Sequence, residues 1–170
     1  MEESNIKNTA IHEAGNAVAH VRIDVLKDQK TIDPGEGILG SSIAEGKNHV
    51  WNAKDAAKQV YCYCAGCAAL MAIGYSAEVA CLGAGDDFEN ASDLLEMWDL
   101  PGTLDEWLNR SAEFMSEPEN IRAVEFVANA LMEYKTLDGD YIEMLVEWAD
   151  GNMTDEEWHQ FVSFHYPGMV

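Results

Sequence analysis

Residues 9–21 read TAIHEAGNAVAHV, and their pattern of apolar side chains predicts an α-helix. From Ile11 to Val21, apolar residues recur at every third or fourth position, which places them on one face of a helix. Thr9 directly precedes this pattern and is of a residue type that caps helices. We therefore expect a helix over residues 9–23 that is capped by Thr9.

This helix carries His12, Glu13 and Asn16 within little more than one turn. In the H-E-x-x-H signature of zinc peptidases, two histidines one turn apart hold the metal, and the glutamate between them activates a water. Asn16 stands at the place of the second histidine. A carboxamide oxygen is a weak donor that suits hard cations better than zinc. The segment is thus an active site with an unusual ligand, the remains of one, or a chance dipeptide.

The other histidines do not obviously replace the missing one. His20 lies eight residues beyond His12, about 12 Å further along a straight helix. Both ligand nitrogens would have to lie within roughly 2.1 Å of the same zinc ion. We expect His20 to be a surface or packing residue. His49, His159 and His165 could contribute only through the tertiary fold.

Length and composition limit the protein class. A chain of 170 residues with 48% hydrophobic side chains predicts one domain, residues 1–170, with its own core. The polar N-terminus does not resemble a signal peptide, and no apolar run approaches the roughly 20 residues that span a bilayer. We expect a soluble, cytoplasmic protein that does not enter the membrane.

Acidic residues dominate the charge: 31 against 10 basic residues give a formal net charge of −21. Such a charge repels nucleic-acid phosphates and anionic membranes, so we expect no direct nucleic-acid binding. The acidity is either a well-solvated surface or a surface that attracts basic proteins.

The remaining segments predict a mainly α fold with a small β-hairpin or short sheet. KTIDPGEGILGSSIAEG, residues 30–46, contains two β-prone pieces around a Pro-Gly turn. Capping patterns at Thr103, Ser116, Asp140 and Thr154 indicate helix starts. The helices expected after residue 50 are 52–74, 86–98, 104–115, 118–135, 140–148 and a short one from 154.

Five segments, taken in order, resemble the peptidase domain of the FtsH family of ATP-dependent zinc metalloproteases, from Thr9 to about Leu145. HEAGNAVAH resembles the HEAGHA helix of that family, and KTIDPGEGILG its strand-turn-strand. CAGCAALMAIG is similar to its AGRAAE segment and GAGDDFENASDL to its GASNDL segment. ALMEYKTLDGDYIEML resembles its late helix pair. Residues 146–170 would be a C-terminal helical extension.

The resemblance implies roles for individual residues. His12 matches the first zinc ligand, Asp87 the third, and Glu13 the catalytic group that polarises the metal-bound water, whereas Asn16 is a weak or lost ligand. We therefore expect the Asp87 carboxylate to lie within about 8 Å of the His12 ring. Without the resemblance, Asp86 and Asp87 would be read as residues that favour the N-terminus of a helix.

The family comparison also bears on the cysteines. Cys62, Cys64, Cys67 and Cys81 lie within twenty residues, which suits a reducing compartment. Their spacing superficially resembles a thiolate metal site. In the family, however, this segment is an internal helix, so we expect core packing. Cys67 and Leu70 replace the arginine and glutamate of AGRAAE.

These features predict a stand-alone zinc-metallopeptidase-like domain with an impaired metal site, weakly active or inactive. Zinc would be weakly bound or absent. The sequence has no G-x-x-x-x-G-K-[ST] loop and hence no ATP site. Any substrate would be an unfolded peptide or protein. The alternative is a non-catalytic acidic binding protein, an inhibitor or adaptor that engages a basic partner such as a nucleic-acid-binding protein.

Overall fold

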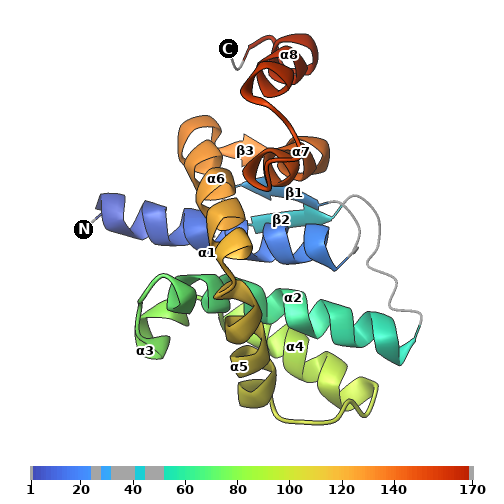
Figure 1. Ribbon diagram of the computed structural model, residues 1–170. Coiled ribbons are helices and arrows are strands. Elements are labelled where there is room, and N and C mark those ends of the chain that lie inside the picture. The colour runs from blue at the N-terminus through green and yellow to red at the C-terminus, as the bar shows by residue number, and fades with distance from the viewer. Residues whose placement is uncertain (1, 24–27, 32–40, 45–51, 169–170) are drawn as a thin grey trace.

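The computed structural model describes residues 2–23, 28–31, 41–44 and 52–168, and this part of the chain is mainly α-helical (Figure 1). The expected helical class is confirmed. The helices are α1 (Glu2–Arg22), α2 (Ala53–Ala72), α3 (Ala77–Ala80), α4 (Gly85–Met97), α5 (Leu104–Met115), α6 (Pro118–Tyr134), α7 (Gly139–Ala149) and α8 (Asp155–His165).

No helix in the described ranges is both long enough and apolar enough to cross a membrane.

Helix α1 forms the centre of the fold. Figure 1 shows it between α2 to α5 on one side and α6 to α8 with the strands on the other. The expected start at Thr9 is wrong, because the helix already begins at Glu2. The Thr9 hydroxyl donates to the carbonyl of Asn5, one turn earlier, at 3.0 Å, as threonine does inside a helix.

Small residues allow α1 and α2 to pack closely. A Cβ added at Gly15 would lie 2.6 Å from the Ala65 carbonyl oxygen and 2.6 Å from the Ala69 Cβ. Only glycine leaves room for the α2 backbone at this distance. The alanine-rich sequence of α2 therefore places its backbone directly against the turn of α1 that carries His12 and Asn16.

Three short strands lie beside the C-terminal half of α1 in Figure 1. Strand β1 (Asp28–Thr31) pairs antiparallel with β2 (Ser41–Ala44) and with β3 (Thr136–Leu137), in the order β2-β1-β3. The β1–β2 pair agrees with the expected hairpin, whose Pro-Gly turn lies outside the described residues. Thr136 and Leu137, which lie between the helices expected at 118–135 and 140–148, pair with β1.

The helix caps agree with the sequence in two of four cases. Thr103 and Thr154 form the expected capping boxes of α5 and α8. The prediction for Ser116 is wrong, because its hydroxyl donates to the Ala112 carbonyl at the end of α5. The prediction for Asp140 is also wrong: Asp138 caps α7, since β3 ends one residue earlier.

Two clusters of apolar side chains stabilise the fold. The larger one is formed mainly by α1, α2, α6 and α7, and Trp158 of α8 joins it by stacking on Trp148 with ring centroids 4.8 Å apart. The smaller one lies between α2, α4 and α5 around Val60, Cys64 and Trp107. This second cluster holds α4, and with it Asp87, against α2.

Candidate functional site

The structure brings the two principal site residues together. Nε2 of His12, on α1, lies 2.9 Å from Oδ2 of Asp87, in the first turn of α4. Their side chains are 15% and 23% exposed, so the contact is partly shielded from water. Because a carboxylate only accepts hydrogen bonds, the ring donates through Nε2–H. The expected proximity of Asp87 to His12 is confirmed.

Asn16 contacts the same carboxylate oxygen. Its Nδ2 donates to Asp87 Oδ2 at 3.4 Å, a long hydrogen bond. The residue is only 6% exposed, and its Oδ1 has no hydrogen-bond partner in the described part of the chain. Asn16 therefore presents an N–H group to Asp87, so that two nitrogen donors converge on one oxygen.

A glycine of α2 makes room for the His12 ring. A Cβ added at Gly66 would lie 2.5 to 2.6 Å from three atoms of the His12 ring. This distance is shorter than the contacts that Cβ atoms make in proteins, so only glycine fits here. The ring thus lies flat against the α2 backbone, and this close packing fixes its direction toward Asp87. Gly66 belongs to the CAGCAAL segment, where the sequence drew attention to Cys67 and Leu70 instead.

Glu13, the expected catalytic residue, lies on α1 directly after His12 and is 7% exposed. His20 is buried at 8% exposure, so of the two roles expected for it, surface or packing, the structure shows packing. His159 and His165 lie on α8, which Figure 1 shows at the opposite end of the molecule from α4. His49 lies outside the described residues.

Three of the four cysteines are buried and all four are free thiols, which agrees with the expected core packing. Burial raises the pKa of Cys64 to about 12, with smaller contributions from Asp87 and Cys81. Burial also raises the pKa of Cys67, and Cys81 and Asp87 act in the same direction. The buried surroundings of Cys64 and Cys67 therefore favour the protonated thiol over the thiolate.

The residues present do not fit a zinc ion. His12 uses its Nε2 as a donor, Asn16 presents an amide N–H, and both are directed at the one carboxylate that would otherwise bind the metal. Among the described residues, no group of three or more histidine, cysteine, aspartate or glutamate side chains is placed to hold a metal ion. Zinc peptidases need three protein ligands that leave one position open.

Asp86 and Asp87 lie in the first turn of α4, where acidic residues favour a helix start, but neither side chain caps the helix. Ala84 occupies the N-cap position of α4, and no side chain caps this end. Asp86 is exposed to solvent, whereas Asp87 turns toward α1. The two neighbouring carboxylates therefore have different environments, and only Asp87 belongs to the site.

No protein-family model matches this chain, and no curated protein matches it either.

Proposed function

We propose that the chain is a non-catalytic relative of FtsH-type peptidase domains, in which a zinc site has been replaced by a hydrogen-bonded cluster of His12, Asn16 and Asp87. The observation that carries this proposal is the shared acceptor: Asp87 Oδ2 receives hydrogen bonds from both nitrogen side chains. The asparagine amide directs an N–H donor at Asp87, whereas the ring nitrogen of a histidine that binds a metal carries no proton.

The cluster has a physical rationale without metal. A carboxylate that is partly removed from water, as Asp87 is, loses hydration that hydrogen bonds must replace. Two N–H donors provide this compensation and join α1 to α4 across the edge of α2. In this proposal the former catalytic turn serves a structural role, and Glu13 no longer activates water.

A second feature favours a role in binding. Helix α4 has four exposed acidic residues with the spacing of one helix face, and it contains no lysine or arginine. They are Asp86, Glu89, Asp93 and Glu96. We therefore propose that the chain binds a partner with a basic surface and that α4 contributes to this contact.

Zinc titration of the intact chain tests the loss of the metal site. We expect no stoichiometric zinc binding and no cleavage of casein, an unfolded substrate. In the Asn16→His variant, zinc affinity should rise by more than about tenfold. Even residues that only contact a metal ligand change the affinity by about tenfold or more, and a ligand itself should change it further. Any cleavage that this variant gains should disappear when Glu13→Gln is added.

Asn129→His is the matched control, since it places the same substitution at an exposed position of α6. It should leave zinc affinity unchanged. Stoichiometric zinc in the unaltered chain, together with casein cleavage that requires Glu13, would overturn the proposal.

A further inference from the structure

Large apolar side chains are exposed along the segment that contains α3 and α4. In the described part of the chain, four large apolar side chains are exposed, and three of them lie between residues 79 and 97. They are Val79, Leu82 and Met97, of which the last two are 75% and 72% exposed. Exposed apolar side chains that gather within a polar surface mark sites of protein interaction.

Met97 lies on the same face of α4 as the exposed acidic residues. At 3.6 residues per turn, it falls within an arc of about 100° together with Asp86, Glu89, Asp93 and Glu96. All five residues, which we call the α4 face, are exposed. The opposite side of the helix packs against α2 and α5, and Figure 1 shows α4 at the margin of the molecule beside them. The α4 face therefore combines a row of carboxylates with an apolar side chain at its C-terminal end.

The carboxylates of the α4 face have no positive partner within the described ranges. No lysine, arginine or histidine occurs between Lys58 and Arg110, a stretch with nine acidic residues that no cation of the same stretch can neutralise. The ion pairs of the described residues are formed by Asp87 and Asp150, neither of which belongs to the α4 face. A second copy of this chain carries the same charges and is repelled. A partner that covers the α4 face must therefore be positively charged.

The spacing of the carboxylates favours a helical partner. The four acidic residues follow one another at intervals of three, four and three residues. At 1.5 Å per residue, the row is about 15 Å long. Basic side chains on one face of a second α-helix repeat at the same intervals, whereas side chains on one face of a strand are roughly 6.6 Å apart. Four such positions on a strand extend about 20 Å, so a strand loses register with the last carboxylate.

We propose that the α4 face, together with Leu82, binds an amphipathic basic helix of a partner protein. Lysine or arginine side chains of this helix pair with the four carboxylates. An apolar side chain at each end of the basic row packs on Met97 and on Leu82, which lies three residues before the start of α4 at Gly85. This inference rests on the proposed binding role of the chain and names the kind of partner.

The two kinds of contact have different effects. Exposed ion pairs contribute little to affinity but orient the partner and accelerate its association. Burial of an apolar side chain contributes more, because it removes apolar surface from water. The charges therefore select a basic partner, and Leu82 and Met97 supply a larger part of the affinity for each residue.

The test titrates a labelled synthetic peptide into the intact chain and follows its fluorescence anisotropy. The peptide has four lysines at the intervals of the α4 carboxylates, a leucine one turn beyond each end of this row, and alanine elsewhere to favour a helix. A control peptide has the same composition, with its lysines distributed around the helix. We expect the first peptide to bind at least about tenfold more tightly. NMR of the isotope-labelled peptide should show that it becomes helical when it binds.

Variants of the chain separate the apolar contact from the charges. Met97→Gln should weaken binding of the first peptide at least about fivefold, because it removes an apolar contact without a change in charge. Phe164→Gln is the matched control: Phe164 is 82% exposed on α8, at the opposite end of the molecule in Figure 1, and its loss should have no effect. Asp93→Asn should weaken binding about twofold. Glu125→Gln, on α6, should leave it unchanged.

Three results would each overturn the inference: equal or absent binding of the two peptides, an extended conformation of the bound peptide, or unchanged affinity in Met97→Gln. If Asp93→Asn still weakened binding in such a case, the chain would bind basic partners through charge alone, and its proposed binding role would stand. That role would fail as well only if charge variants on α4 had no effect on any basic partner. The zinc titration reports separately on the loss of catalysis.

Discussion

His12 and Asp87 are 75 residues apart in sequence, yet Nε2 of one lies 2.9 Å from Oδ2 of the other. The contact joins α1 to the first turn of α4 beside Gly66 of α2. It therefore depends on three helices at once, and each can be altered separately.

Removal of the shared acceptor should destabilise the fold. Asp87→Ala leaves the His12 and Asn16 donors without this partner, and we expect it to lower the free energy of unfolding by about 1–3 kcal/mol. Asp86→Ala is the control, because it removes an exposed carboxylate from the same turn of α4. Both variants lose the same interaction with the helix dipole, so the difference between their free energies of unfolding reports the cluster alone. Urea unfolding measures both. Equal losses would show that the cluster contributes nothing.

Close packing at two glycines should make them sensitive to a single methyl group. Gly66→Ala forces the His12 ring to move, and Gly15→Ala meets the α2 backbone. We expect each to cost about 1–3 kcal/mol, the usual range for an overpacked core. Gly85→Ala has no neighbour within 4 Å and should be neutral or slightly stabilising in α4. Thermal and urea unfolding compare the three.

The Gly66 variant also makes a spectroscopic prediction. Because its methyl group displaces the ring, the His12 imidazole resonances should shift in an NMR spectrum, whereas Gly85→Ala should leave them in place. Unchanged His12 resonances in a folded Gly66→Ala protein would contradict the described packing of the ring on α2.

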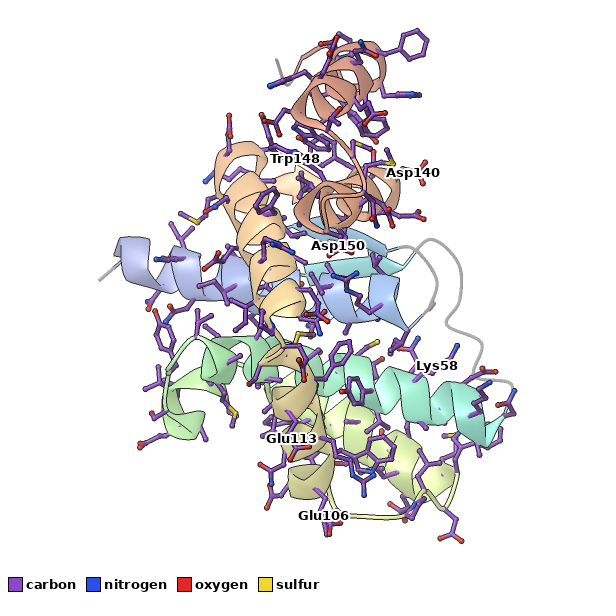
Figure 2. The ribbon with its side chains drawn as sticks, viewed as in Figure 1. Lys58, Glu106, Glu113, Asp140, Trp148 and Asp150 are labelled. Carbon is purple, nitrogen blue, oxygen red and sulfur yellow. The ribbon has the colours of Figure 1, made fainter. Side chains whose placement is uncertain are left out.

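An ion pair that connects α1, α6 and α7 should make stability depend on pH. Arg22 donates to both carboxylate oxygens of Asp150, at 2.5 and 2.7 Å, and to Asn120 Oδ1 at 3.0 Å. Asp150 is labelled in Figure 2, close to α6 and α7. The hydrogen bonds from Arg22 lower the pKa of Asp150 below its ordinary value of 3.8.

A carboxyl group whose pKa is lowered in the folded state stabilises the fold at pH values above its ordinary pKa. This contribution is lost as the pH falls through the folded-state pKa. Asp150→Asn should therefore cost about 2 kcal/mol at pH 7. Its difference from the unaltered chain should shrink below about pH 4. Urea unfolding at several pH values measures this, with exposed Glu125→Gln as the control. A difference that stays constant down to pH 3 would contradict the role of the ion pair.

The acidic face of α4 predicts salt-dependent binding. The affinity for a protein partner isolated with the intact chain should weaken between about 0.05 and 0.5 M salt, because screening shortens the range of charge interactions. The double variant Glu89→Gln, Glu96→Gln should weaken binding and make the affinity depend less on salt. The control double variant Glu113→Gln, Glu125→Gln, which removes two exposed carboxylates from other helices, should have a smaller effect. Figure 2 shows Glu113 on α5. Equal effects of both pairs, or affinity indifferent to salt, would exclude α4 as the contact.

Local sequence rules predicted most helices because the signals that start and end them lie within a few residues. Thr103 and Thr154 cap their helices through contacts three residues away. The rules failed at Thr9, Ser116 and Asp140, where a competing neighbour decided the result. Ser116 caps the end of the preceding helix, and the pairing of β3 with β1 moves the start of α7 to Asp138.

The sequence by itself determined the helical class, the negative charge and the pattern of His12, Glu13 and Asn16. The resemblance to a zinc peptidase placed Asp87 beside them, and the structure agrees. Only the tertiary structure decided that Asn16 directs its N–H group at Asp87 and that Gly66 receives the His12 ring. Hydrogen-bond direction and atomic clearance depend on how helices distant in sequence pack, and no local pattern encodes them.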